Sequence, residues 1–150
     1  MLTLNELQAY LQENNSDFEL IAHETPIQST QDAAKYFDIE KAAPTLVIQT
    51  ENGLLALIVS SNRGRVDLKT LAEQLGFAKV KMADRTKVQE LTGYQAGAIP
   101  FIGHQLPCVV DERLLGYDYI FGGSGDECTT LKIAPSDVVR LNRVVHYIGE

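Results

Sequence analysis

The chain has 150 residues, of which 45% are hydrophobic and 22% are charged. This length and composition are those of one folded domain over residues 1–150, and they exclude a disordered tail or a collagen-like fibre. No apolar run approaches the roughly 20 residues of a membrane span, and the first ten residues lack the basic and apolar regions of a signal peptide. Two cysteines are too few for a secreted disulfide framework, so we expect a cytoplasmic protein without a membrane partner.

The charge is unevenly distributed along the chain. The formal net charge of −7 makes the surface as a whole repel polyanions, so we expect no DNA partner. Residues 63–87 differ, with seven basic and three acidic side chains. This stretch is either a solvated helix and strand surface or a local contact for nucleic acid, and both interpretations stay open.

The first elements are predicted from caps and spacing. Thr3 and Glu6 form a capping-box pattern, and the leucines that follow have helical spacing, which predicts a helix from Leu4 to about Asn14. Residues 18–21 indicate a short strand. A second helix start is predicted at residues 29–32.

A β-hairpin is predicted in the middle of the chain. Residues 45–49 and 54–59 are apolar and rich in β-formers, and Glu51-Asn52-Gly53 connects them. Asn-Gly tolerates the positive φ angles of a tight turn, which favours a hairpin at this place.

Short helices and strands follow one another through the rest of the chain. Aspartates 67 and 84 are predicted to cap helices that end at Gly76 and before Gly93. The further expected elements are strands over 79–82, 108–111, 117–121 and 130–133, a helix over 135–141 and a strand over 144–148. Without strict β-α-β alternation, this order predicts an α+β (mixed α/β) fold.

Spacing alone reveals no known catalytic motif. Cys108 and His104 could pair as a thiol nucleophile and its base, but Cys108 lies in an apolar run where cysteine often acts as a small buried hydrophobe. His23, His104 and His146 with the two cysteines match no specific zinc spacing. We therefore expect neither a metal nor another cofactor.

Two glycine-containing segments are candidate binding loops. Backbone N–H groups of the turn Gly122–Gly125 could bind a phosphate or carboxylate, although such a turn is often structural. The segment 93–100 combines aromatic, glycine and proline residues, as functional loops in compact domains often do.

These loops carry a family resemblance. The patterns Leu91-Thr92-Gly93-Tyr94 and Gly97-Ala98-Ile99-Pro100, with Leu106-Pro107 and Asp111 after them, resemble the YbaK/ProX-type aminoacyl-tRNA deacylases. This family includes the editing domain inserted in bacterial prolyl-tRNA synthetases. The resemblance covers about residues 15–148, and it implies a single YbaK/ProX-like domain with a curved mixed sheet flanked by helices.

The resemblance also implies a reaction that contributes to translation fidelity. The family hydrolyses the ester that joins a wrong, small amino acid to the 3′ end of a tRNA, without a metal. The expected partners are therefore a tRNA acceptor end and a small aminoacyl group. Because the ester is already activated, positioning and backbone polarisation could suffice for hydrolysis.

Site residues follow from the same resemblance. The implied catalytic set is Thr30, Gly97, Pro100 and His104. The implied substrate-binding set is Thr45, Ala98, Ile99, Gly122, Gly123, Ser124 and Gly125. The candidates for tRNA contact are Arg63, Arg65 and Lys69.

The chain departs from the family pattern at two places. The family lysine before Thr45-Leu46-Val47 is replaced by Pro44, and Lys41 lies three residues earlier. The family GxxxP loop is one residue shorter, with Phe101 at the proline position. Two functions therefore stay open: a deacylase acting in trans, or a catalytically silent module that binds an amino-acid-like ligand or a tRNA end. The oligomeric state is not predicted.

Overall fold

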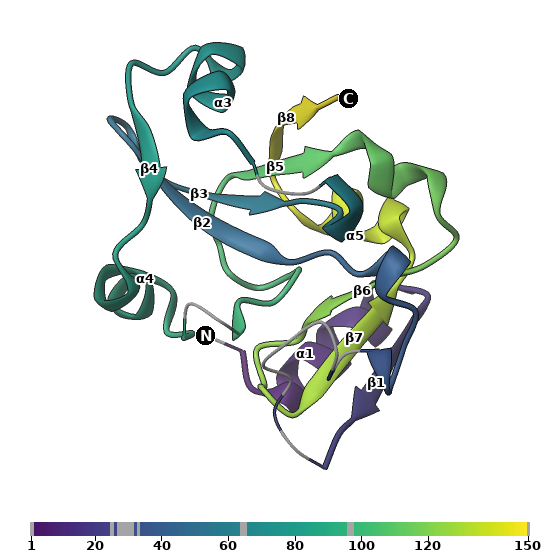
Figure 1. The fold of residues 1–150 in the computed structure, drawn as a ribbon. Helices are drawn as coiled ribbons and strands as arrows, with labels where there is room; N and C mark the ends of the chain where they lie inside the picture. The colour runs from purple at the N-terminus through teal and green to yellow at the C-terminus, as the bar shows by residue number, and fades with distance from the viewer. Residues whose placement is uncertain are drawn as a thin grey trace.

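The described strands form two sheets, and Figure 1 shows β1, β6 and β7 of the smaller sheet below β2 and β3 of the larger one. The structure, a computed structural model, describes residues 2–24, 26, 32, 34–63, 66–95 and 98–149. The α-helices in this part of the chain are α1 (Leu4–Glu13), α3 (Leu68–Leu75), α4 (Arg85–Thr92) and α5 (Pro135–Leu141). The strands are β1 (Phe18–Ala22), β2 (Thr45–Thr50), β3 (Gly53–Ile58), β4 (Val80–Met82), β5 (Cys108–Asp111), β6 (Ile120–Gly123), β7 (Thr129–Ile133) and β8 (Val144–Ile148).

The larger sheet has the strand order β4-β2-β3-β5-β8. Its first three strands are antiparallel, and the predicted hairpin is confirmed, with Thr45 opposite Ile58 and Thr50 opposite Gly53. Strands β3, β5 and β8 run parallel to one another, so the sheet is mixed.

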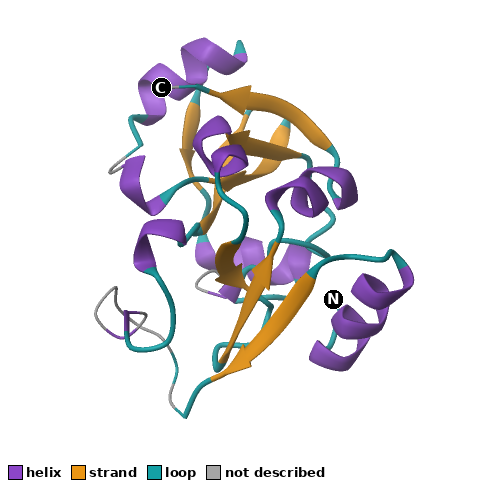
Figure 2. Cartoon of the chain, turned by 90° about the vertical axis from the view of Figure 1, so that its right-hand side faces the viewer, coloured by secondary structure: helices purple, strands orange, loops and turns teal. Residues whose placement is uncertain are grey.

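The smaller sheet is antiparallel, with the order β1-β7-β6. Figure 2 shows it as a separate ribbon of strands below the larger sheet. The sheets are linked at one seam, where the Ala43 N–H donates to the Phe121 carbonyl at 2.8 Å and the Phe101 N–H donates to the Gly123 carbonyl at 3.0 Å.

Alternation along β3 explains how the layers are arranged. Leu55, Leu57 and Val59 pack against α3, whereas Ala56 and Ile58 point into the core between the two sheets. That core also contains apolar side chains of α1 and α5. The period of two in a strand therefore gives the larger sheet an α3 face and an inner face.

The predicted helix signals operate as expected. The carboxylate of Asp67 accepts from the backbone N–H groups of Lys69 and Thr70, and Asp84 does the same at the start of α4. Gly76 and Gly93 end these helices in the left-handed region, with φ of 77° and 83°. Here a residue without Cβ avoids backbone strain.

The α+β fold class is confirmed, with some local differences. The strand expected over 117–121 lies later, at β6, because Glu112–Gly116 forms a 3-10 helix first. The strands form two sheets where one curved sheet was expected. The helix start expected at residues 29–32 lies largely outside the described residues. No helix among the residues that the structure describes is long and apolar enough to cross a membrane.

Candidate active site

The first residues of β2 form an open sheet edge. Strand β4 pairs with β2 only from Ile48 to Thr50, and the Ala83 N–H then donates to the Val47 carbonyl at 3.1 Å. Within the described strands, no neighbour pairs with the outer side of β2 at Thr45. In antiparallel pairing, alternate residues direct their backbone groups to opposite sides, so Thr45 shares its outward direction with Val47. Its N–H and C=O therefore point to the side of β2 that no described strand covers.

The side chain of Thr45 is buried, and no described residue bonds to its hydroxyl. The residue is 8% exposed. Such a group usually has a partner, because leaving it unpaired costs about 1–3 kcal/mol. Thr45 shares the inner face of the sheet with Ile58, its cross-strand neighbour, and with Val47. The hydroxyl is therefore a candidate ligand-binding group.

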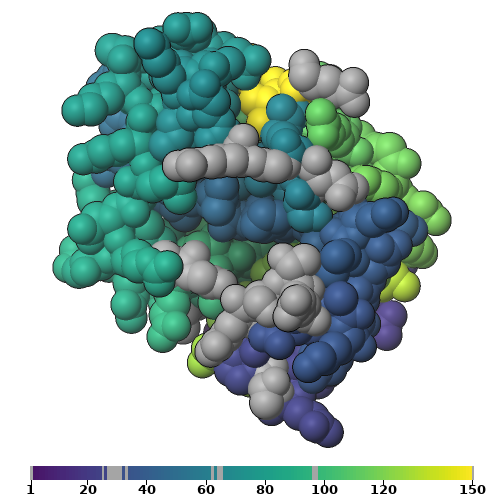
Figure 3. All heavy atoms as spheres, in the orientation of Figure 1, coloured from purple at the N-terminus to yellow at the C-terminus, as the bar shows by residue number. Residues whose placement is uncertain are grey.

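The loop 98–101 lies on the same side of β2. The Ile99 side chain is buried in a cluster with Val47, Val88 and Tyr94, which fixes the loop between β2 and α4. Pro100 and Phe101 are buried as well, and the Ala98 N–H donates to the Gln95 carbonyl at 2.9 Å. Figure 3 shows a hollow in the surface below β2 on this side.

The glycine-rich turn packs closely against that loop. A Cβ on Gly123 would lie 2.1 Å from the Ile99 carbonyl oxygen, and one on Gly122 would lie 2.2 Å from the Phe101 ring. A Cβ on Gly125 would lie 2.6 Å from the Tyr94 ring. The hydroxyl of Ser124, a buried residue, donates to the Thr129 carbonyl at 2.7 Å. The space that side chains would need at these glycines is thus occupied by the loop 98–101 and by Tyr94. Substrate binding at this turn stays a prediction.

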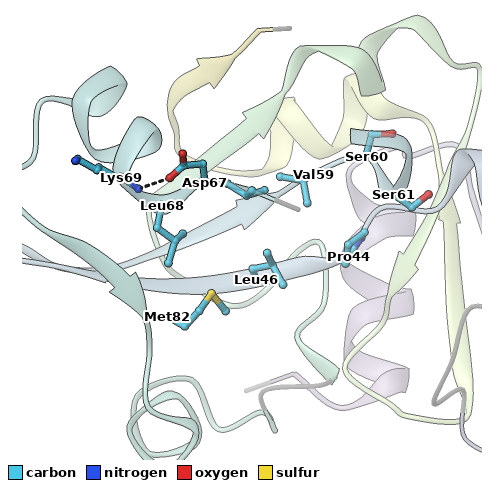
Figure 4. Close-up of a pocket in the computed structure, with 10 residues that line it drawn as sticks. Pro44, Leu46, Val59, Ser60, Ser61, Asp67, Leu68, Lys69 and Met82 are labelled. Atoms are coloured by element: carbon cyan, nitrogen blue, oxygen red, sulfur yellow. Dashed lines mark hydrogen bonds between the residues drawn. The ribbon is translucent and has the colours of Figure 1, made fainter. Parts of the chain in front are cut away.

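A cavity of about 840 Å³ lies on the α3 face of β2, beside Pro44 (Figure 4). Its described walls are largely apolar, with polar groups at the rim. The lining residues are Pro44, Leu46, Val59, Ser60, Ser61, Val66, Asp67, Leu68, Lys69 and Met82. The cavity and the hydroxyl of Thr45 therefore lie on opposite faces of the strand, and the open edge of β2 separates them.

The predicted tRNA contacts have different environments. Lys69 is exposed at the rim of this cavity. Arg63, by contrast, makes two hydrogen bonds to Asp111, at 2.8 and 2.9 Å, and also donates to the carbonyls of Ile148 and Gly149. Its guanidinium is engaged inside the fold, and contact with tRNA stays a prediction for it.

Asp111 has a structural role at the end of β5. Burial alone would raise the pKa of its carboxyl, but hydrogen bonds from Arg63, Ser60 and Arg113, with the positive charge of Arg63, outweigh this and lower the pKa. The carboxylate thus joins the end of β5 to the segment after β3.

His104 is buried, and it does not line the cavity beside Pro44. It is 2% exposed, and its Nδ1 accepts a hydrogen bond from the Leu106 N–H at 3.0 Å. Burial lowers its pKa to about 4, although the side chain of Asn142 opposes this shift. The ring is therefore neutral at pH 7, and a role as catalytic base stays a prediction that this burial does not favour.

The thiol hypothesis receives no geometric support. Cys108 is fully buried, and burial raises the pKa of its thiol to about 12. Its thiolate is therefore almost absent near neutral pH. Within the described part of the chain, no three His, Cys, Asp or Glu side chains are grouped to hold a metal ion.

Three of the predicted site residues, Thr30, Arg65 and Gly97, lie outside the described residues. Of the others, the structure brings Ile99 and Pro100 together with Gly123, and it brings Lys69 to the cavity beside Pro44. The sequence analysis did not predict that Leu46 and Met82 line a cavity. The period of two could have placed Leu46 on the face opposite Thr45, but the position of Met82 depends on how β4 pairs with β2.

The contact between His23 and Thr130, two buried polar residues, was also not predicted from the sequence. His23 lies at the end of β1, and its Nε2 is 2.6 Å from the hydroxyl of Thr130. Its ring also contacts that of Tyr36, with the centroids 4.2 Å apart. Burial lowers its pKa, and its Nδ1 has no hydrogen-bond partner among the described residues.

Comparison with known proteins identifies the class to which this fold and site belong. The family model described as the aminoacyl-tRNA editing domain matches residues 24–141, a range that includes both sides of the β2 edge. The chain therefore belongs to the aminoacyl-tRNA editing domain family, which confirms the resemblance drawn from its loops.

Individual relatives agree with this assignment. The chain is 29% identical over 118 residues to EbsC of Enterococcus faecalis (strain ATCC 700802 / V583), named as a candidate Cys-tRNA(Pro)/Cys-tRNA(Cys) deacylase, with 75% of this chain and 71% of that protein covered. A crystal structure described as a candidate trans-editing enzyme for prolyl-tRNA synthetase matches with a TM-score of 0.82 and 24% identity, covering 97% of this chain and 96% of that one. The structure of the hypothetical protein APE2540 also has a TM-score of 0.82, at 23% identity over 94% and 96% of the two chains. At these identities the two structures support the fold.

Proposed function

We propose that the protein is a trans-acting deacylase, with residues 1–150 as one editing domain. It hydrolyses the ester between a small amino acid and the 3′ end of a mischarged tRNA. The observation that carries the proposal is the buried hydroxyl of Thr45, which has no hydrogen-bond partner among the described residues. It lies at the open edge of β2, directly after the position where the family has its lysine.

Hydrolysis of the ester requires that its carbonyl group is polarised and that a water molecule is positioned to attack it. The outward N–H of Thr45 can donate to the ester carbonyl oxygen, where negative charge develops during attack. The Thr45 hydroxyl can orient the attacking water or the amino group of the substrate. The adjoining loop 98–101 is held by buried side chains, which supports a pre-formed wall for the aminoacyl group.

Pro44 favours a second candidate function. A proline side chain supplies neither the ammonium nor the N–H donor that the family lysine would offer. A silent module with the same edge and cavity would bind a tRNA end or an amino-acid-like ligand without releasing the amino acid. Both functions would use the same surface, but only the deacylase would release the amino acid from the tRNA.

Single-turnover deacylation with excess protein tests the proposal. Cysteinyl-, alanyl- and seryl-tRNA are the substrates, and correctly charged tRNAs are the controls. Cysteinyl-tRNA(Pro) is the substrate to test first, because the name of the relative EbsC contains it. We expect release of the amino acid from one of the mischarged tRNAs at a rate well above spontaneous hydrolysis. No release from any of them would contradict the deacylase function for these substrates.

The variant Pro44→Lys separates the two functions. Pro44 is exposed, so a lysine fits there without repacking the core. For a deacylase the wild-type chain already releases the amino acid, and the variant changes the rate. For a silent module the wild-type chain binds these tRNAs without release, and the added lysine creates turnover.

A further inference from the structure

A second cavity, of about 380 Å³, lies between α1, the end of α5 and the segment that follows the loop 98–101. Its apolar wall consists of Leu2, Ile102, Leu106 and Leu141 with the ring of Tyr10. Among the described residues, it shares no part of its lining with the cavity beside Pro44. Small-molecule sites are typically concave, mostly apolar and a few hundred cubic ångströms in volume, so this second cavity has the size and character of one.

The polar part of the second cavity has one charge, and it is positive. Among the described lining residues only Arg143 is charged, and the amide side chains there are those of Gln105 and Asn142. Arg143 and Gln105 are exposed, and their side chains form no hydrogen bond or ion pair with any described residue. In a chain with a formal net charge of −7, an apolar cavity with an unpaired guanidinium favours an anionic ligand. The planar donors of a guanidinium match a carboxylate in particular.

We infer that the second cavity binds a small molecule that has an apolar body and one carboxylate, without an amino group. The apolar body lies against the leucine and isoleucine side chains, and the carboxylate accepts hydrogen bonds from Arg143 and Gln105. Because no described lining residue is negatively charged, an ammonium group would lose water without gaining a charged partner. The inferred ligand therefore differs from a free amino acid.

A tight turn holds the edge of this cavity in place. Gln105 has a φ of 62°, which is uncommon for a residue with a Cβ atom. The buried ring of His104 supports the turn, since its Nδ1 accepts from the Leu106 N–H at 3.0 Å. Gly103 has a φ of 97°, and a Cβ there would lie 2.9 Å from Cδ1 of Leu2. The wall is thus fixed before a ligand arrives, which reduces the entropy lost on binding.

The wall of the second cavity is also bonded to the loop of the candidate active site. The Asn142 amide donates to the Phe101 carbonyl at 2.8 Å, and the Leu2 N–H donates to the Tyr94 hydroxyl at 2.8 Å. Tyr94 packs in one cluster with Ile99. A ligand in the cavity therefore lies against residues that hold the loop 98–101, and we expect it to change the surroundings of Tyr94. An effect on deacylation rests on the proposed function, whereas binding itself does not.

NMR of 13C-labelled tyrosine rings tests the inference on the wild-type chain. The chain has six tyrosines, and the variants Tyr10→Phe and Tyr94→Phe assign the two signals that matter. The probe is 4-methylpentanoate, an apolar carboxylate. We expect it to shift the signals of Tyr10 and Tyr94 in a saturable way and to leave Tyr119, which bonds to Asp17, unchanged. An unmoved Tyr10 signal would overturn the site, and an unmoved Tyr94 signal would overturn its link to the loop.

Two matched probes test the chemistry of the ligand. The molecule 4-methylpentanamide has the same apolar body without the charge, and leucine has the same body and carboxylate with an added amino group. We expect both to bind at least about fivefold more weakly than 4-methylpentanoate. Equal binding of the amide would overturn the role of the carboxylate, and equal binding of leucine would overturn the exclusion of amino acids.

Two pairs of variants test the place of binding. Arg143→Gln should weaken binding of 4-methylpentanoate by about fivefold or more and leave that of the amide unchanged, whereas Lys35→Gln removes a positive charge from an exposed residue outside the lining and should change neither. Leu141→Trp should fill the cavity, and Leu91→Trp places the same side chain at a 62% exposed site on α4. Thermal unfolding checks that the variants fold, and Arg143→Gln decides if Leu141→Trp does not. Wild-type binding of 4-methylpentanoate in Arg143→Gln would overturn the inference.

The outcome is distinguishable from that of the deacylation assay, because the NMR experiment contains no tRNA. Binding at Tyr10 without hydrolysis of any aminoacyl-tRNA would keep the second cavity as a ligand site and remove the deacylase function. Hydrolysis without any shift at Tyr10 would keep the deacylase function and overturn the second site.

Discussion

At the scale of single residues, two buried threonines on β2 differ in the hydrogen bonds that their hydroxyl groups make. Thr50 is buried and well bonded, since its hydroxyl donates to the Gly53 carbonyl at 3.0 Å and accepts from the Asn52 N–H at 3.1 Å. Thr45 is buried on the same strand, and its hydroxyl has no hydrogen-bond partner in the part of the chain that the structure describes. Removing each hydroxyl should therefore have opposite effects.

We expect Thr45→Val to leave the free energy of unfolding unchanged or to raise it by about 1 kcal/mol, because an unpaired buried hydroxyl is lost. The single-turnover rate of deacylation should fall by about tenfold or more. Thr50→Val is the control, with a loss of about 1 kcal/mol in stability and normal activity. Urea unfolding and single-turnover assays measure both, and normal activity in Thr45→Val would remove this residue from the site.

Asp111 predicts a dependence of stability on acid. Its pKa is lower in the folded protein than in the unfolded chain, so the ionised group stabilises the fold above the unfolded pKa near 3.9. That contribution is lost as the pH falls through the folded pKa. We expect Asp111→Asn to cost about 3–5 kcal/mol at pH 7, since it leaves Arg63 without its charged partner, and to reduce the further loss of stability below pH 4.

The control for Asp111 is an exposed ion pair. Lys132 and Glu19 are 3.9 Å apart on neighbouring strands of the smaller sheet, at the surface. Lys132→Met should change the free energy of unfolding by less than about 1 kcal/mol. Equal costs for the two substitutions would contradict the role given to Asp111.

At the scale of elements, the joint between β6 and the loop 98–101 depends on the absence of a side chain. A Cβ on Gly123 would meet the Ile99 carbonyl oxygen, a backbone atom that cannot rotate away. We expect Gly123→Ala to cost about 1–3 kcal/mol and to move the loop away from β6. Gly116→Ala is the control, because nothing lies within 4 Å of its added Cβ. Urea unfolding and deacylation rates show whether the two substitutions differ as expected.

Elements with local signals could be predicted from the sequence. The Asn52-Gly53 turn, the caps at Asp67 and Asp84 and the helix Pro135–Leu141 are determined by neighbouring residues, so their bounds were nearly correct. The pairing of β1 with β7 and the parallel contact of β3 with β5 join segments far apart in the chain, and no local pattern specifies them.

The same limit applies to the candidate site. The importance of Thr45 and the loop 98–101 came from the family resemblance, whereas the unpartnered hydroxyl and the cavity require three dimensions. The basic residues of the stretch 63–87 could be counted in the sequence. Which of them are exposed and which are bound inside the fold could not be predicted. Arg63 is held by Asp111 inside the fold, and Lys69 is exposed beside the cavity.

At the scale of the whole molecule, an acidic protein carries one basic region. The exposed basic residues of this region are Lys79 just before β4, Lys81 on β4, and Arg85 and Lys87 at the start of α4. Strand β4 also contributes Met82 to the cavity beside Pro44. The carboxylate of Asp84, which lies among them, accepts backbone hydrogen bonds of α4. This region is therefore suited to meet the phosphates of an acceptor arm.

We expect tRNA binding to weaken steeply with salt. Each phosphate contact contributes about −0.9 to the slope of log K against log salt concentration for a duplex. The double variant Lys81→Glu/Arg85→Glu should make that slope shallower by about 2. The pair Lys35→Glu/Lys132→Glu, with the same change in net charge outside this region, should alter it less. Equal slopes for the two double variants would contradict this docking surface.

The pairing of β1 with β7 also has a consequence for synthesis on the ribosome. Phe18 pairs with Ile133, so β1 has no partner until more than a hundred further residues have been made. At ordinary elongation rates this interval is on the order of 10 s. During that time the nascent chain has an unpaired strand edge and no seam between its sheets. The candidate site is therefore a late product of folding, and we expect the N-terminal part of the growing chain to need protection from aggregation until the smaller sheet can form.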